Sequence, residues 1–183
     1  MFSRRKRHQQ LTRALCDNRH RLYKLAYSWT SDPMLADDLV QESMQKAFQS
    51  FDSLKDDAKL NAWTCRIMLN CYRDWLRRQK DTVNLEDFEF ADEGDPLQNF
   101  AADDTSAMVR FCISKLNEKH RSVVTLVDLM ELSYEEVAQA LEVPIGTVMS
   151  RLCRARAQLR NLLERQMREQ PSAEKLVSLK RVK

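Results

Sequence analysis

Residues 133–160, SYEEVAQALEVPIGTVMSRLCRARAQLR, form the pattern that most restricts the fold of this chain. Ser133 and Glu136 have the spacing of a capping box, in which each side chain accepts a hydrogen bond from the other residue's backbone N–H. A helix is therefore predicted directly after the serine. Pro144 suits the first turn of a second helix, because its fixed φ is helical and its missing N–H would have no partner there. We expect two helices joined by a tight turn, the second beginning near Ile145.

The predicted second helix has an apolar stripe and polar, cationic faces. Such a helix buries one side and leaves the other free to contact phosphates and base edges. The apolar positions are Val148, Leu152, Leu159 and Leu162, and the other faces carry Thr147, Ser150, Arg151, Arg154, Arg156 and Arg160. Gly146 would let another backbone approach closely. A solvated helical hairpin shares part of this pattern, but the capping box, the proline and the arginines together favour a DNA-binding helix-turn-helix.

Charge is distributed in blocks along the 183 residues. Residues 1–80 carry 16 Lys+Arg against 9 Asp+Glu, residues 81–104 carry none against 9, and residues 105–183 carry 14 against 9. Two basic blocks around an acidic one favour two nucleic-acid-facing modules over a uniformly charged globule. The acidic block has no clear helical period and is predicted to be a flexible linker.

Helical spacing dominates the rest of the sequence, and the whole chain contains only 2 glycines and 4 prolines. We therefore predict an all-α fold of two small helical domains. Apolar residues from Leu15 to Trp29 lie on one face of a predicted helix that ends near Ser31. Asp32 is expected to cap the next helix and Pro33 to open it, and the outer face of that helix is acidic and rich in amides.

A cationic stripe is predicted on a further helix, from about residue 62 to residue 80. Its members are spaced four, three and four residues apart, which places them on one line along the helix. They are Arg66, Asn70, Arg73 and Arg77. The pattern alone is equally consistent with a solvated surface and with an edge that binds a nucleic-acid backbone.

Other residue types give no indication of a metal centre, a disulfide framework or a catalytic site. The 5 cysteines are odd in number and lack C-x-x-C spacing, and the 3 histidines are scattered. We expect buried reduced thiols, no cofactor, no metal and no enzymatic activity. No apolar run reaches the roughly 18 residues that span a bilayer, and no apolar segment follows the basic N-terminus. A soluble cytoplasmic protein without membrane insertion is expected.

Two parts of the chain resemble extracytoplasmic-function sigma factors, a group of the sigma-70 family. YKLAYSWTSDPMLADDLVQESMQKAF and NAWTCRIMLNCYRDWLRRQK are similar to the sigma-2 domain, and LNEKHRSVVTLVDLMELSYEEVAQALEVPIGTVMSRLCRARAQL is similar to the sigma-4 domain. The resemblance implies a sigma-2 domain at 10–80, an acidic linker at 81–104, a sigma-4 domain with the helix-turn-helix at 105–168, and a tail at 169–183. It implies a dissociable subunit that directs RNA polymerase to the promoters of a stress- or signal-responsive regulon.

The resemblance also implies a role for each polar surface. The segment that docks on the clamp coiled coil of the largest polymerase subunit would contain Asp38, Leu39, Gln41 and Glu42. The minus-10 element would be bound by Lys59, Asn61, Asn70, Arg73, Arg77 and Arg78. There the DNA strands open and a base is flipped into a pocket, of which the loop with Lys59 and Asn61 would form part. The minus-35 element would be bound in its major groove by Thr147, Ser150, Arg151, Arg154 and Arg156. Departures from the family pattern at Met149, at Cys153 and in the 52–60 loop leave the promoter sequence open.

The implied partners are core RNA polymerase, through its largest and second-largest subunits, promoter DNA, and an anti-sigma factor that covers the polymerase-binding surfaces. The acidic linker would follow a basic channel of the polymerase toward the RNA exit path. The residues alone leave two other functions open. One is a free-standing helix-turn-helix regulator that binds duplex operators without polymerase, and the other is an adaptor that binds only protein through its apolar helices.

Overall fold

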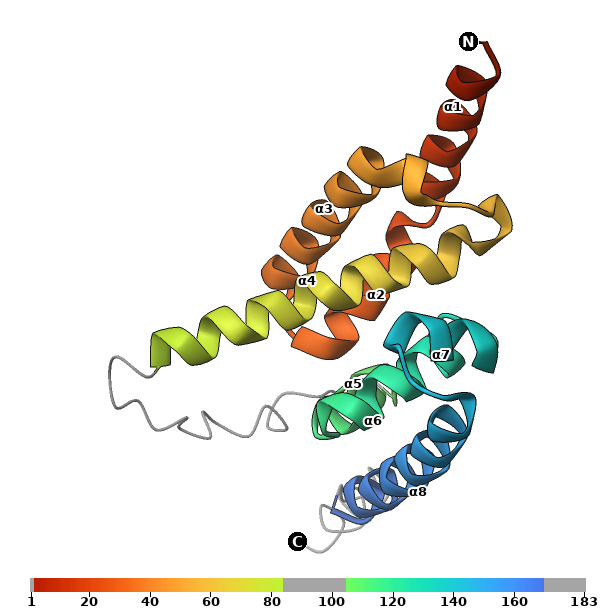
Figure 1. The fold of residues 1–183 in the computed structure, drawn as a ribbon. Coiled ribbons are helices and arrows are strands. Elements are labelled where there is room, and N and C mark those ends of the chain that lie inside the picture. Colours follow the sequence, from red (N-terminus) through yellow and green to blue (C-terminus); the bar gives the residue numbers. More distant parts are fainter. Residues whose placement is uncertain (1, 84–104, 170–183) are drawn as a thin grey trace, which may run out of the picture.

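A computed structural model describes residues 2–83 and 105–169, and every regular element in these ranges is helical (Figure 1). The predicted all-α fold is therefore confirmed. The first domain contains α1 (Phe2–Asp17), α2 (Arg19–Thr30), α3 (Pro33–Ser50), the short 3-10 turns η1 (Phe51–Ser53) and η2 (Asp57–Lys59), and α4 (Leu60–Val83). The second domain contains α5 (Thr105–Ser114), α6 (Glu118–Val124), the π-helical turn η4 (Thr125–Leu129), α7 (Tyr134–Leu141) and α8 (Ile145–Glu169).

Two of the predicted boundaries differ from the structure. The helix expected around Leu15 to Trp29 is divided into α1 and α2 at Asn18, whose side-chain amide donates to Asn61 Oδ1 at 2.6 Å. Asparagine is a poor interior helix residue because its side chain has such alternative partners. The helix expected to end near residue 80 continues to Val83, so it includes the first residues of the predicted linker. The rest of that linker, and the tail from residue 170, lie outside the described residues.

The predicted helix starts are confirmed. The Asp32 carboxylate accepts hydrogen bonds from the backbone N–H groups of Met34 and Leu35 at 2.8 and 3.1 Å, and Pro33 is the first residue of α3. At the start of α7, Ser133 and Glu136 form both hydrogen bonds of the capping box, at 3.2 and 2.8 Å. These bonds satisfy N–H groups that have no partner inside a helix.

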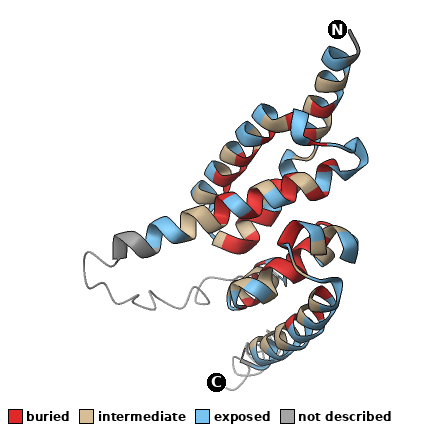
Figure 2. Cartoon of the chain, in the orientation of Figure 1, coloured by how far each residue is buried: buried red, intermediate tan, exposed pale blue. Residues whose placement is uncertain are grey.

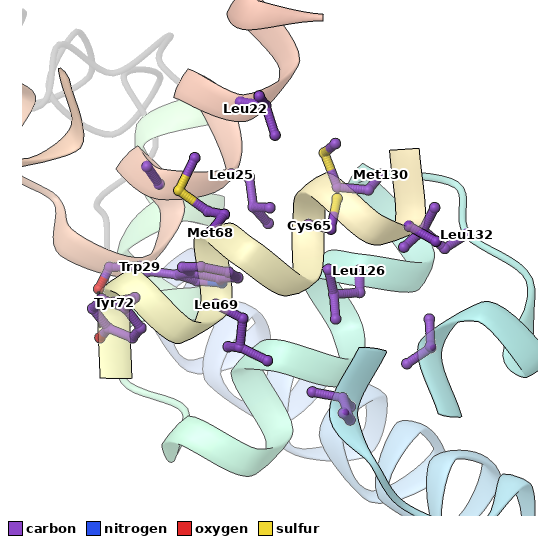
Figure 3. Packing of buried hydrophobic residues seen from close by; sticks show 14 of the residues in the cluster. Leu22, Leu25, Trp29, Cys65, Met68, Leu69, Tyr72, Leu126, Met130 and Leu132 are labelled. Atoms are coloured by element: carbon purple, nitrogen blue, oxygen red, sulfur yellow. Dashed lines mark hydrogen bonds between the residues drawn. The ribbon is translucent and has the colours of Figure 1, made fainter. Parts of the chain in front are cut away.

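One apolar cluster extends through both domains (Figures 2 and 3). In the first domain α3 and α4 pack on one another and α2 packs on α3. In the second, α6 and α7 pack on α8, while α4 contacts α7 and α2 contacts α5 across the domain boundary. Leu69 of α4 and Leu126 of η4 are both fully buried members of the shared cluster. The two domains of the free chain therefore lie against each other, in what we call the closed arrangement.

Candidate nucleic-acid interface

A buried polar network joins the two domains. The indole Nε1–H of Trp29 donates to Thr125 Oγ1 at 2.9 Å. The Arg121 guanidinium donates to the Trp29 carbonyl at 2.9 Å and to the Tyr72 hydroxyl at 3.0 Å. Its other terminal nitrogen donates to the carbonyls of Ser114 and Leu116 at 2.7 and 2.8 Å, within the second domain. Burial raises the pKa of Tyr72, so the hydroxyl keeps its proton. Charged donors of this kind make the stronger class of hydrogen bonds.

The cationic stripe of α4 faces the second domain. Arg73 Nε donates to Glu118 Oε1 at 2.9 Å, and Arg66 forms an ion pair with Glu142, the residue that ends α7 in a left-handed conformation. Arg77 pairs with Asp74 of its own helix. Asn70 is exposed and lines a hollow with Arg73, Leu76, Arg77 and Glu118. The structure thus aligns the stripe as predicted, with two of its arginines held by carboxylates of the other domain.

Of the two residues predicted for a flipped-base pocket, only one lies in a hollow. Lys59 lines a hollow with Trp63 and Arg66 of α4. Its opposite side is formed by α7, through Glu136 and Gln139. Asn61 is turned toward Asn18 instead and is not among the lining residues. In the closed arrangement α7 therefore borders the place predicted for the minus-10 base.

The acidic face predicted for polymerase is on α3. Asp38 and Gln41 are exposed, and Glu42 pairs with Lys46 one turn along the helix at 2.7 Å and with Arg78 at 3.8 Å. The hydrogen bond to Glu42 raises the pKa of Lys46. Leu39 differs from the other three, because it is 2% exposed and belongs to the core. Its role in this structure is to anchor α3, and the free surface consists of the polar residues.

The second helix of the predicted helix-turn-helix is α8, the candidate recognition helix, and it is half buried, as its pattern predicted. Val148, Leu152 and Ala155 are buried, whereas Ser150 and Arg154 are exposed. Thr147 and Arg151 are partly exposed. No other described segment makes the close backbone approach expected at Gly146, because a Cβ placed there would have no atom from beyond its own helical turn within 4 Å. Packing among the described residues therefore does not require a glycine at this position.

Arg156, the remaining residue predicted for minus-35 DNA, has an acceptor in its own domain. Its Nε donates to Asp128 Oδ2 at 3.1 Å and its terminal nitrogen to the other carboxylate oxygen. This hydrogen bonding raises the pKa of Arg156. The forked pair ties α8 to η4, so Arg156 braces the recognition helix in this structure.

The cysteines divide into two groups. Cys65, Cys71 and Cys112 are buried as expected, and burial raises the pKa of Cys65 to about 12. Cys16 and Cys153 are exposed, which corrects the prediction that all thiols are buried. Within residues 2–83 and 105–169 there is no group of three or more His, Cys, Asp or Glu side chains arranged for a metal ion. None of the helices in those ranges is long and apolar enough to cross a membrane.

The contacts between the domains could not be recognised in the sequence. Glu118 and Glu142 look like ordinary helix-terminal acids, and Trp29 and Thr125 look like ordinary core positions. The indole of Trp29 and the hydroxyl of Thr125, which form a hydrogen bond, are 96 residues apart in the sequence. Such pairs leave no short-range spacing to recognise, because they depend on how the domains pack.

Two protein-family models match the chain: Sigma-70 region 2 at residues 17–82 and Sigma-70, region 4 at residues 106–159. The chain is 32% identical over 163 residues to the RNA polymerase sigma-H factor of Pseudomonas aeruginosa, which covers 82% of this chain and 84% of that protein. It is 32% identical over 139 residues to the ECF RNA polymerase sigma-E factor of Escherichia coli strain K12, with 69% of this chain and 73% of that protein covered.

Two solved structures have a similar fold. One is the sigma factor RpoE in complex with the anti-sigma factor NepR from Bartonella quintana, with a TM-score of 0.67 and 26% identity, covering 90% of this chain and 98% of that chain. The other is CnrH in complex with the cytosolic domain of CnrY, with a TM-score of 0.62 and 25% identity, covering 85% of this chain and 88% of that chain. Both matches extend over most of the chain, beyond the length of either domain alone.

Proposed function

Because this chain belongs to the extracytoplasmic-function sigma factors of the sigma-70 family, we propose that each of its polar surfaces has a separate role in promoter recognition. The chain is an alternative sigma factor, and a free-standing regulator is not favoured, since family models match both halves. We assign it no catalytic activity of its own. A cytoplasmic location follows from the proposed partners, polymerase and promoter DNA.

Each domain contains its own cationic helix face, and this observation supports the proposal. On α4 the stripe with Asn70 and Arg73 lies beside the hollow that contains Lys59, which suits an opened strand with an unstacked base. On α8 the exposed Ser150 and Arg154 suit the edges of bases in a major groove. We assign the first face to the minus-10 element and the second to the minus-35 element.

The acidic face of α3 is assigned to core polymerase. Asp38, Gln41 and Glu42 are on the surface of a helix whose opposite side is anchored in the core by Leu39. Exposed carboxylates on a rigid helix attract a basic partner surface over a distance. Such charges mainly set the rate of association and its salt dependence.

The domains must separate before both promoter elements are bound. Elements named minus-35 and minus-10 are about 25 base pairs apart, which is about 85 Å of duplex at 3.4 Å per base pair. In the closed arrangement Arg66 of the minus-10 stripe pairs with Glu142, which lies in the turn of the helix-turn-helix. We infer that the closed arrangement is inactive and that polymerase binds an opened chain.

An anti-sigma factor is the partner that would favour the closed arrangement. The similar structure of RpoE was solved with the anti-sigma factor NepR, and that sigma chain superimposes on 90% of this one. We propose that an anti-sigma partner of this chain binds across both domains and keeps them together. Pull-downs from uninduced cells should recover such a partner, and recovery of polymerase alone would contradict this part of the proposal.

In vitro transcription tests the assigned function directly. Core polymerase is supplied with the full chain, or without it, on a library of templates, and new promoter-specific starts should depend on the chain. Their absence from every template would contradict promoter recognition. Replacement of Asn70 or Arg73 by alanine should reduce permanganate reactivity of the opened strand more than binding of duplex minus-35 DNA. Equal loss of both activities would point to misfolding.

A further inference from the structure

The N-terminal half of α1 holds the loop that forms one wall of the Lys59 hollow. Arg7 Nε lies 2.9 and 3.2 Å from the two carboxylate oxygens of Asp57, and one terminal nitrogen lies 2.6 Å from Oδ1 of the same carboxylate. The same nitrogen donates to the Leu54 carbonyl at 2.5 Å. One guanidinium thus joins two points of the loop formed by residues 51–60, which we call the 51–60 loop. The planar guanidinium binds the carboxylate with two nitrogens at once and still reaches the carbonyl, a geometry that the compact ammonium group of a lysine does not offer.

Further contacts from α1 reach the start of the same loop. Arg4 forms an ion pair with Asp52. The ring of His8 meets the ring of Phe51 edge to face, with centroids 5.4 Å apart, and Phe51 is 1% exposed. These contacts hold the first turn of the loop while Arg7 holds its middle. The hydrogen bonds from Arg7 and Arg4 lower the pKa values of Asp57 and Asp52, as expected for carboxylates that accept from a guanidinium.

The held segment is the one that borders the hollow. Ser53, Leu54, Lys55, Asp56 and Lys59 of the loop are lining residues, together with Trp63 of α4. The side chain of Asp56 is occupied within the loop, where it accepts from Ala58 N at 3.0 Å. Arg7 itself does not line the hollow. It can therefore act on a base in the hollow only through the shape of the loop.

These residues lie partly outside the family pattern. The region 2 match begins at residue 17, so Arg4, Arg7 and His8 precede it. Their acceptors, Asp52 and Asp57, lie in the loop that departs from the usual family sequence. The basic side chains of α1 and the carboxylates of the loop are complementary in charge.

We propose that Arg7 is a positioning residue for minus-10 specificity, which fixes the 51–60 loop in the shape that admits one flipped base. This proposal rests on the assignment of the Lys59 hollow to the minus-10 element. Exposed ion pairs contribute little individually, so the expected effect is a change of preference between bases and no loss of folding. The expected loss of discrimination is at most about fivefold at one promoter position, the factor that corresponds to the strongest exposed ion pairs.

The test uses holoenzyme assembled from core polymerase and the full chain. The probe is a pool of forked DNA whose nontemplate minus-10 strand is randomised, and bound molecules are recovered and sequenced. Arg7→Gln removes the fork and Asp57→Asn removes its acceptor charge. Arg13→Gln makes the same charge change at an exposed position of α1 and serves as the matched control. Far-UV circular dichroism melts establish that each variant folds.

Arg7→Gln and Asp57→Asn should lose base preference at the same promoter position. If Arg7 acts through the loop, Arg7→Gln and Asp57→Asn both flatten the preference at the same single position, and Arg13→Gln leaves it unchanged. Uniform weakening over all sequences in Arg7→Gln alone would overturn the proposal, because it would make Arg7 a phosphate contact. Unchanged preference in both variants would overturn it too. A wild-type holoenzyme that selects no sequence at all would instead contradict the assigned function.

Discussion

The hydrogen bond between Trp29 and Thr125 allows a direct test of the closed arrangement. Thr125→Val keeps the shape of the side chain and removes the acceptor of the indole N–H. Trp29 and Thr125 are 3% and 1% exposed, so the N–H would remain buried without a partner while the domains are closed. Leaving a buried donor unsatisfied costs about 1 to 3 kcal/mol. In the opened chain water can satisfy it, so the closed state alone is destabilised.

That difference predicts a measurable shift in the equilibrium between closed and open chains. About 1 to 3 kcal/mol corresponds to a factor of about 5 to 150 in the opening constant. The thiol of Cys65 on α4 can report opening, because it is fully buried in the cluster shared by both domains. It also lies near α7, since the charge of Glu136 contributes to raising its pKa. Site-resolved alkylation should label Cys65 faster by this factor, since labelling follows the open population when opening is fast.

Two comparisons make this experiment decisive. Ser122→Ala removes a hydroxyl that donates only to Glu118 O within α6, so it should leave the Cys65 rate unchanged. Cys112, buried in the second domain, should not gain reactivity in Thr125→Val. An unchanged Cys65 rate in Thr125→Val would refute the reasoning. Equal gains at Cys65 and Cys112 would refute it as well, because they would indicate local unfolding of the second domain.

Other surfaces give separate predictions. Glu42→Lys should leave far-UV circular dichroism unchanged and weaken binding to core polymerase at near-physiological salt; unchanged affinity would remove the assignment of α3. Arg154→Ala should cost about 1 to 3 kcal/mol at one minus-35 position in a binding series of single-base variants, and uniform weakening would reassign it to a phosphate. Arg156→Ala should chiefly lower the melting temperature, because its fork to Asp128 braces α8; an altered base preference at an unchanged melting temperature would contradict this.

Features that depend on neighbours within one helical turn could be predicted from the sequence. The capping box of Ser133 and Glu136 and the cap at Asp32 involve residues at most three apart. The exposure of Ser150 and Arg154 followed from the helical period alone. The break at Asn18 could not be predicted, because the partner of its side chain is 43 residues away.

The composition of the candidate site was predictable, but its pairing was not. Spacing placed Arg66 and Arg73 on one stripe, yet the carboxylate that binds Arg73 is 45 residues away in the other domain. Arg156 looked like a DNA contact because its charge is visible in the sequence, whereas Asp128, its acceptor 28 residues away, is not marked by any pattern. The charge of a residue predicts that it forms an ion pair, but the packing of the fold determines which residue of opposite charge is its partner.

The arginines of the stripe cannot pair with carboxylates and with phosphates at the same time. Arg66 and Arg73 are held by Glu142 and Glu118 in the closed arrangement. If the proposed assignment of the stripe holds, closing and minus-10 binding compete, and by linkage each weakens the other by the same factor. Exposed ion pairs contribute only about 0.2 to 1 kcal/mol each, so the buried Trp29 network and the apolar cluster supply most of the closing free energy. Added salt weakens DNA binding steeply through counterion release, whereas buried contacts are screened little. Salt should therefore shift this chain from the DNA-bound state toward the closed one, even as it weakens both exposed pairs.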